Sequence, residues 1–453
     1  MNCPRCSTVV SPDARFCSAC GAPLAADAIA PPRRHRVVVT GLGAITSLGP
    51  TVEETWRGIL AGETGIRRAD NLDGGDHACR VRGDVDSATI PQRALTGKVA
   101  RNASRFTHMA IEATADALLQ AGLVDANLEP TADLSAGGAV IGTCVGGTHD
   151  DFLAAWDNYK TRGEGRIAPH LHVMFPHNLA AYNIQARWGM GGPSLTLATA
   201  CATGAQAIGE AFREVREGHA PIMIAGAVES TQHPMFISGF AAMRALPTDS
   251  NDDPGAASRP FDASRAGFVL GEGAAALVLE SLEHAEARGA SILAEIVGFA
   301  TSNDAYHPIA PIPEGTGSAR AIRAALADAG LSPEAVDHIN AHAASTPAGD
   351  LAEANAIRLV FGERAADIPV TSIKGAVGHC MGASGAIETV AAVMTIVAQT
   401  IPPTRNYRTP DPAIGLDIVH DAPRPAAVNV ASKHSFGLGG QNACLILARF
   451  ADA

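Results

Sequence analysis

Short apolar runs alternate with helical stripes along most of this chain, and that alternation is the feature that most restricts its fold. Residues 36–40 form an apolar run, and residues 105–121 repeat apolar side chains with helical spacing. A similar succession of runs and stripes returns after residue 290. Strands and helices that alternate in this way pack as α/β layers. We therefore expect an α/β layered fold with two comparable halves, residues 36–290 and residues 291–453.

The composition narrows the class of protein. Hydrophobic residues make up 47% of the 453 residues but aromatic residues only 4%, so the core must be built from small aliphatic side chains. The net charge of -12 makes nucleic acid an unlikely partner, since surfaces that bind nucleic acid are basic. The longest apolar helical run, about residues 390–401, is too short to cross a bilayer. With no secretory leader visible, we expect a cytoplasmic protein that does not associate with membranes.

A separate unit, residues 1–24, precedes the α/β region. It holds two CxxC pairs, whose four cysteines are Cys3, Cys6, Cys17 and Cys20. Four thiolates at this spacing suit a tetrahedral Zn²⁺, and the metal would supply the folding free energy that so small a segment lacks. Chance spacing or redox chemistry is the alternative. We expect a structural zinc ribbon, followed by a linker over residues 25–35. The segment resembles short zinc-ribbon modules, which dock proteins or nucleic acid, and we expect it to dock a carrier or another protein of the pathway. The other five cysteines are scattered, which argues against a disulfide framework.

Cys201 falls where an expected buried strand, residues 194–198, gives way to a helical stripe at residues 208–215. Its sulfur would then lie at the N-terminus of a helix. Such a position stabilises an anion by about 1 kcal/mol, which lowers a thiol pKa by roughly one unit. The alternative is a buried structural cysteine.

Three further side chains that are capable of chemistry follow expected strands in Gly- or Ala-rich loops. His342 follows residues 336–340, whereas Lys374 and His379 follow residues 370–373. Taken singly, each histidine is a satisfied structural residue and the lysine a solvated charge. Together with Cys201 they form a nucleophile–base set at equivalent strand ends. The pair Gly41 and Gly43 does not predict a dinucleotide site, because Thr46 stands where GxGxxG needs its third glycine.

From about Arg36 to Ala451 the chain resembles the β-ketoacyl-[acyl-carrier-protein] synthases, most closely their elongating type II branch. The motifs that carry the resemblance are Ala198-Thr199-Ala200-Cys201, Asn340-Ala341-His342, Ser345-Thr346-Pro347, Lys374 with Gly378-His379, Ser435-Phe436-Gly437, Ser258-Arg259-Pro260-Phe261-Asp262 and Gly271-Glu272-Gly273. The resemblance implies the thiolase-like fold, with two stacked βαβαβαββ halves, and an obligate homodimer. It also implies an acyltransferase that condenses an acyl chain with a malonyl-type extender held on an acyl carrier protein.

The resemblance assigns a role to each residue of the site. Cys201 would hold the acyl chain, and His342 and His379 would stabilise the enolate formed by decarboxylation. Backbone N–H groups of Cys201 and Leu438 would form the oxyanion hole. Lys374 would fix the charge of the site with three further partners, Asp350, Glu353 and Glu388. The substrate-binding residues would be Thr346, Phe240, Val145 and Phe436. The chain would need no organic cofactor of its own, because the carrier protein brings the phosphopantetheine.

Three departures from the family pattern bear on the substrate. Ala344 removes a hydroxyl that would hold the pantetheine arm, Leu438 replaces a gating phenylalanine, and Gln441 replaces a threonine. We therefore expect a specialised acyl chain, in fatty-acid or polyketide biosynthesis. Two alternatives are a catalytically reduced partner subunit, which would usually lack the cysteine, and a CoA-dependent thiolase, which would use a second cysteine in place of two histidines.

Overall fold

The computed structural model describes residues 6–9, 19–20, 34–69, 72 and 77–451. The ribbon cysteines Cys3 and Cys17 and most of the expected linker lie outside these residues. The strands are β1 Val37–Ile45, β2 Arg67–Arg68, β3 Val81–Arg82, β4 Gly138–Gly142, β5 Ser194–Leu195, β6 Ile222–Glu229, β7 Gly273–Ser281, β8 Ala294–Asn303, β9 His338–Asn340, β10 Pro369–Thr371, β11 Thr400–Ile401, β12 Asp417–Ile418, β13 Arg424–Pro425, β14 Val430–Gly437 and β15 Gln441–Ala448. The α-helices are α1 Val52–Leu60, α2 Gly97–Arg101, α3 Arg105–Gln120, α4 Leu153–Arg162, α5 Leu179–Trp188, α6 Thr203–Arg216, α7 Pro234–Ala242, α8 Leu282–Ala287, α9 Thr316–Asp328, α10 Pro347–Phe361, α11 Lys374–Val377 and α12 Ser384–Ala398.

The main sheet shows the predicted duplication. Its order is β12-β10-β9-β14-β15-β8-β1-β7-β6-β4-β5. Apart from the extra end strand β12, the order β5-β4-β6-β7-β1 of the first half corresponds to β10-β9-β14-β15-β8 of the second, with parallel pairs outside and antiparallel pairs inside. The halves join through the antiparallel pair β1 and β8. The expected thiolase-like α/β fold is confirmed.

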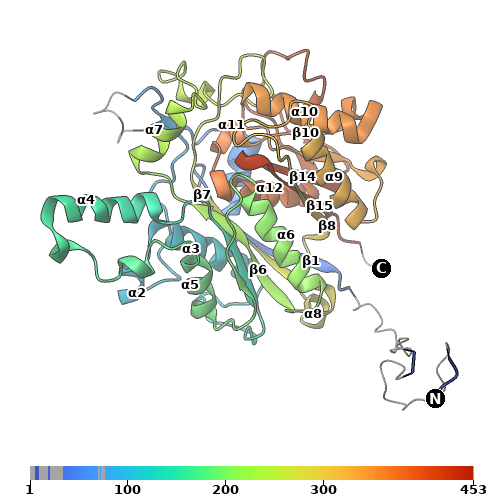
Figure 1. Cartoon of the computed structure of the whole chain (residues 1–453), viewed down its shortest axis with the longest axis horizontal. Coiled ribbons are helices and arrows are strands. Elements are labelled where there is room, and N and C mark those ends of the chain that lie inside the picture. Colours follow the sequence, from blue (N-terminus) through green and yellow to red (C-terminus); the bar gives the residue numbers. More distant parts are fainter. Residues whose placement is uncertain (1–5, 10–18, 21–33, 70–71, 73–76, 452–453) are drawn as a thin grey trace.

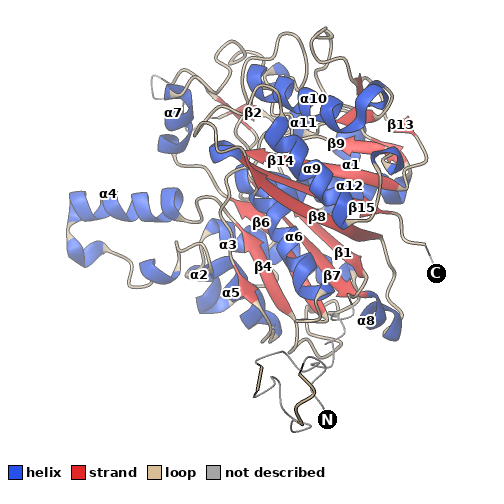
Figure 2. Cartoon of the chain, turned by 45° about the vertical axis from the view of Figure 1, so that its right-hand side comes forward, coloured by secondary structure: helices blue, strands red, loops and turns tan. Residues whose placement is uncertain are grey.

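Helices cover the sheet in layers, as Figure 2 shows. Helices α3 and α5 pack over one face of the first half, and α9 and α10 pack over the corresponding face of the second. Helices α6 and α12 lie against each other in the centre of the molecule, where the largest apolar cluster lies. Their contact needs glycine, because a Cβ on Gly204 would lie 2.5 Å from the backbone nitrogen of Ala386. This central pair fixes the position of the segment that precedes α6.

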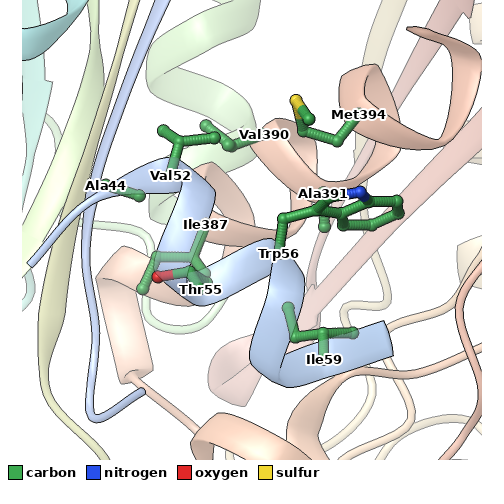
Figure 3. Close-up of a pocket in the computed structure, with 9 residues that line it drawn as sticks. All are labelled: Ala44, Val52, Thr55, Trp56, Ile59, Ile387, Val390, Ala391 and Met394. Atoms are coloured by element: carbon green, nitrogen blue, oxygen red, sulfur yellow. The ribbon is translucent and has the colours of Figure 1, made fainter. Parts of the chain in front are cut away.

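Helix α12 is a core helix. Residues Met381–Ala398 are long and apolar enough to cross a membrane, but 83% of that stretch is buried inside the protein. Trp56 of α1 packs against its Val390 and Ala391, as Figure 3 shows. The cavity left among these apolar side chains is only about 10 Å³, so it is a packing defect rather than a binding site.

One sequence prediction of the fold is wrong in part. The strand expected at residues 194–198 is limited to Ser194–Leu195 and is exposed rather than buried. The strand is exposed because β5 is the last strand of the sheet and has a neighbour on one side only. An apolar run therefore leads to an edge, and Leu195 remains 43% exposed.

Candidate active site

A cavity of about 430 Å³ lies where loops from both halves of the chain meet. Cys201 comes from the first half, just before α6, and His342 and His379 come from the second half, after β9 and α11. The fold thus brings the three side chains to one cavity. Lys374 lies behind the wall and is fully buried.

The turn that carries Cys201 has a strained backbone. Ala200 has a φ of 49°, in the left-handed region that residues other than glycine seldom adopt. The Thr203 hydroxyl holds the turn, since it accepts the N–H of Thr199 at 2.7 Å and donates to the carbonyl of Ala200 at 2.7 Å. The Cys144 thiol donates to the same carbonyl at 3.0 Å. Because α6 begins at Thr203, Cys201 does lie at the N-terminal end of a helix, as predicted.

The predicted effect of that position on the thiol is wrong. Burial raises the pKa of Cys201 to about 11, although the Lys374 charge and the backbone N–H of Leu438 both act to lower it. The side chain is only 6% exposed, so the cost of placing an anion there exceeds the help of a helix terminus. At pH 7 roughly one molecule in 10⁴ would hold the thiolate. Ionisation must therefore accompany the binding or attack of a substrate.

The two histidines face each other across the cavity. Their ring centroids lie 5.4 Å apart at 77°. Nδ1 of His379 accepts the Met381 N–H at 3.2 Å and lies 2.8 Å from the Ser384 hydroxyl, which leaves the ring proton on Nε2. Burial, and next Lys374, hold the pKa of both rings well below the usual value of 6.5. Both rings are therefore neutral N–H donors at pH 7.

A buried charge cluster supports this wall. The ammonium of Lys374 donates to the carbonyl of His342 and to Glu388. The second oxygen of Glu388 accepts from Lys433 at 2.6 Å. All three ionic side chains are at most 2% exposed. Lys374 thus reaches the cavity through the backbone of His342 rather than by its own side chain.

Glu353 does not have the expected role beside Lys374. Within the described residues it makes no ion pair with that lysine. Its carboxylate accepts the backbone N–H groups of His342 at 2.9 Å and Ala343 at 2.7 Å, and pairs with the His434 ring at 3.1 Å. Glu353 therefore holds the loop after β9 in place.

Asp350 also differs from the expectation. It accepts the backbone N–H groups of Phe261 at 2.8 Å and Thr346 at 3.2 Å, and its nearest cation is Arg265 at 3.9 Å. Burial raises its pKa to about 7. Since the described contacts connect it to backbone and to Arg265, it fixes the chain around the cavity rather than the charge of Lys374. Of the three expected partners, Glu388 alone contacts the lysine.

The expected substrate-binding residues divide into two groups. Phe240, Thr346 and Phe436 line the cavity, together with Leu438. Val145 does not line it and packs instead against the adjoining apolar cluster that includes Cys201. The Val145 backbone N–H donates to buried Glu229 at 3.1 Å.

The N–H groups expected to form the oxyanion hole lie close together. Backbone N–H groups of Leu438 and of Cys201 itself both lower the pKa of the Cys201 thiol. Gly437 permits this approach, because a Cβ there would lie 2.8 Å from the Cys201 nitrogen. The site therefore has two backbone donors beside the Cys201 sulfur.

Several residues of the site were not found from the sequence. They are Lys433, His434, Ser384 and Glu229. A signal existed for Lys433, since it lies in a strand that closes the chain and lysine is almost never buried unless it is paired. Glu229 and Ser384 give no such signal, because only the folded chain brings them to the backbone of the site.

The ribbon is described only in part. Cys6 and Cys20 belong to the described residues, whereas Cys3 and Cys17 do not. Four cysteine thiols in two CxxC pairs are a donor set that fits Zn²⁺.

Family comparisons divide the chain into three segments. Residues 34–285 match the model described as the beta-ketoacyl synthase N-terminal domain, and residues 293–408 match its C-terminal domain. Residues 2–24 match the zinc-ribbon domain.

Individual proteins and structures agree with these matches. The 3-oxoacyl-[acyl-carrier-protein] synthase 2 of Synechocystis sp. is 44% identical, over 92% of this chain and 99% of its own length. Its namesake from Staphylococcus aureus is 42% identical, with the same coverage. A beta-ketoacyl synthase from Burkholderia phymatum has a TM-score of 0.84 at 34% identity, over 92% of this chain and all of its own. The structure of a type II PKS acyl-carrier protein in complex with its ketosynthase has a TM-score of 0.83 at 33% identity, over 92% of this chain and all of its own.

Proposed function

The chain belongs to the beta-ketoacyl synthase family, and from this premise we propose that it condenses an acyl chain held on Cys201 with a malonyl-type extender carried by an acyl carrier protein. It is an acyltransferase of fatty-acid or polyketide biosynthesis. The observation that carries the assignment of residues is the single cavity that contains Cys201, His342 and His379.

The first half-reaction loads the enzyme. The Cys201 sulfur attacks the thioester carbonyl of an acyl carrier, and the thiol proton passes to the carrier sulfur, which leaves as the carrier thiol. The oxyanion that develops accepts the N–H groups of Cys201 and Leu438, which lie beside the sulfur. The carrier thiol then departs and the acyl chain remains on Cys201.

The second half-reaction forms the carbon–carbon bond. The neutral rings of His342 and His379 donate N–H bonds to the thioester carbonyl of the extender. Carbon dioxide leaves, and the enolate attacks the acyl carbonyl on Cys201, which departs as the thiolate. Removing one such donor costs about 10²–10³ in rate. Lys374 holds the His342 backbone for this task.

The substrate is proposed to be a specialised acyl chain. Ala344 and Leu438 both line the cavity, and both replace larger or more polar residues of the family pattern. With these smaller or less polar side chains, the cavity is wider and less polar at the positions proposed for the pantetheine arm and the acyl chain. A panel of carriers loaded with acyl chains of different length and branching would identify the preferred chain.

The remaining parts of the assembly follow from the resemblance. Zn²⁺ would be held by Cys3, Cys6, Cys17 and Cys20, and would supply the folding free energy of the ribbon. The ribbon would dock the carrier or another protein of the pathway. The enzyme would work as a cytoplasmic homodimer.

Mass spectrometry of Cys201 tests the proposal. After mixing with acyl carriers, the wild-type chain should gain an acyl adduct on Cys201, and malonyl carrier should convert it to a β-ketoacyl product. The variant Cys201→Ser should form neither thioester nor product. His342→Ala should form the adduct but lose about 10²–10³ in condensation rate. No adduct from any carrier would contradict the proposal and favour a non-catalytic partner subunit that sets chain length or scaffolds a complex.

A further inference from the structure

We propose that Lys433 is a positioning residue of the condensation: by sharing Glu388 with Lys374 it gives the wall of the cavity an excess positive charge, which favours the thiolate of Cys201 and an anionic substrate group beside it. The inference rests on the proposed function for its meaning in catalysis. It adds to that function a second buried cation, which the mechanism above does not use.

The contacts of Lys433 are those of a charged group held in place. It lies on β14 and is fully buried. Its ammonium bonds to Glu388 at 2.6 Å, to the Ser435 hydroxyl at 2.6 Å and to the backbone carbonyl of His434. All three ammonium hydrogens therefore have acceptors, and only one of those acceptors carries a negative charge.

The charge balance around Glu388 is unequal. Each of its oxygens is in contact with one lysine, Lys374 or Lys433, so two cations share one carboxylate. The other carboxylate that faces Lys433 is Glu353, which is occupied by two backbone N–H groups and His434. Among the described residues, the titratable groups whose pKa these two lysines affect include Cys201, Cys380, Cys444, His342, His379, Glu353 and Glu388, and the lysines also affect each other.

This arrangement explains why the site has two lysines. The charge of Glu388 opposes ionisation of Cys201, whereas Lys374 favours it. A neutral Lys374–Glu388 pair would leave the thiol with little electrostatic help in a buried site. Lys433 compensates Glu388, so the charge of Lys374 acts on the sulfur without being cancelled. The same excess charge opposes protonation of His342 and His379, so both rings stay neutral and donate through one ring nitrogen each.

Alkylation of Cys201 tests the inference without any substrate. Wild-type chain and Lys433→Met are treated with neutral iodoacetamide and with anionic iodoacetate at fixed pH, and the modified Cys201 peptide is counted by mass spectrometry. Lys433→Met should react with iodoacetamide about tenfold more slowly, the effect of a pKa one unit higher. The rate with iodoacetate should fall further, so the iodoacetate-to-iodoacetamide ratio should drop at least threefold. Lys433→Arg, which keeps the charge, should restore the ratio.

Cys444→Ala is the matched control. Cys444 lies opposite His434 on β15, is equally buried and carries no charge, so its removal loosens the same part of the core. Its two rates and their ratio should stay within twofold of wild type. The inference is overturned if Lys433→Met keeps the wild-type ratio. It is also overturned if both Lys433→Met and Lys433→Gln fail to fold while Cys444→Ala folds, because Lys433 would then serve stability alone.

The same experiment separates the two proposals. Alkylation does not depend on an acyl carrier or an extender. A charge-dependent ratio in a protein that makes no β-ketoacyl product would refute the proposed function, but it would still show that the charge of Lys433 acts on the Cys201 thiol. Normal condensation by Lys433→Met, with an unchanged iodoacetate-to-iodoacetamide ratio, would refute the inference about Lys433 and leave the proposed function in place.

Discussion

At the scale of single residues, two opposing effects act on the Cys201 thiol. The N-terminus of α6 and the Lys374 ammonium favour the anion, and burial opposes it. Burial is the larger effect, because a helix terminus contributes at most about 2 kcal/mol whereas complete desolvation shifts a pKa by several units. The Cys201 thiol therefore stays protonated at neutral pH.

The first prediction concerns the pH dependence of this thiol. Since burial raises its pKa to about 11, alkylation of Cys201 by iodoacetamide should rise about tenfold per pH unit from pH 6.5 to 9.5 without a plateau. Peptide mass spectrometry would measure the rate at Cys201 alone, with Cys201→Ser as the blank. A plateau below pH 9 would mean that the helix terminus controls the thiol after all.

The sequence sufficed for the reactive residues and not for their electrostatics. Cys201, His342 and His379 follow strand ends, and sequence order is enough to place such residues at a common edge of an α/β fold. The direction of a pKa depends on which side chains exclude water, as the error at Cys201 shows. Lys433 lies more than fifty residues along the chain from Lys374, and no local pattern indicates that the two lysines share Glu388.

At the scale of elements, strand β9 carries a histidine with an unusual environment. His338 is fully buried, and neither ring nitrogen has a partner among the described residues. Burial lowers its pKa to about 3, so the folded chain keeps the ring neutral where the unfolded chain protonates it. The stability that this histidine contributes is complete above pH 6.5 and is lost as the pH falls from 6.5 toward 3.

The second prediction follows from that sign. Between pH 7.5 and pH 5 the wild type should lose about 2 kcal/mol of unfolding free energy through His338. In His338→Leu this contribution is absent, so the total loss should be smaller by about 2 kcal/mol. Urea unfolding at the two pH values measures the difference. Asp350, whose raised pKa of about 7 acts with the opposite sign, is present in both chains and cancels. His219→Leu, at an exposed position, controls for the removal of a histidine; equal losses in all three chains would contradict the prediction.

The third prediction concerns the crossing of α6 and α12. Gly204→Ala should destabilise the protein by about 1–3 kcal/mol, because its Cβ would meet the Ala386 backbone at 2.5 Å and neither helix backbone can yield. Acylation of Cys201 should slow as well, since α6 begins two residues beyond it. Gly239→Ala in α7 is the control, because a Cβ there meets nothing within 4 Å and should stabilise the helix slightly. Thermal or urea unfolding of both variants decides.

The elements themselves were predictable where their pattern is long and local. Helix α3, expected at residues 105–121, is Arg105–Gln120. Strand β5 was overestimated, because an apolar run looks the same whether the sheet continues beyond it or ends. Sheet order decides that question, and sheet order depends on contacts between distant segments.

At the scale of the whole molecule, the fourth prediction concerns zinc. The full-length chain should contain about one zinc ion, and Cys6→Ser should lose it, because a structural site needs all four thiolates. Cys79→Ser, at a buried cysteine of the synthase region, should keep it. Elemental analysis of the purified chains gives the content. Condensation of small soluble thioesters should survive the Cys6 change while docking of a protein partner weakens; zinc retained in Cys6→Ser would refute the ribbon assignment.

The fifth prediction is that two copies associate through the β5 edge. This edge ends the eleven-stranded sheet and has unpaired backbone groups on its outer side, with Leu195 43% exposed. In Figure 1 helix α4 projects from the same half of the molecule, and its Trp156 and Tyr159 are 49% and 47% exposed. An open strand edge and exposed aromatic side chains in the same half are unfavourable in a monomer and suit a second copy.

Light scattering after gel filtration should therefore find twice the mass of one chain. Leu195→Lys should shift the protein toward the monomer, because two like charges would face each other at a self-complementary edge. Leu359→Lys places the same charge on α10, where leucine is equally exposed at 44% but belongs to the outer layer of the other half, and should leave the dimer intact. If Leu195→Lys stays dimeric at micromolar concentration, the copies meet elsewhere, and the exposed face of α4 becomes the surface to change next.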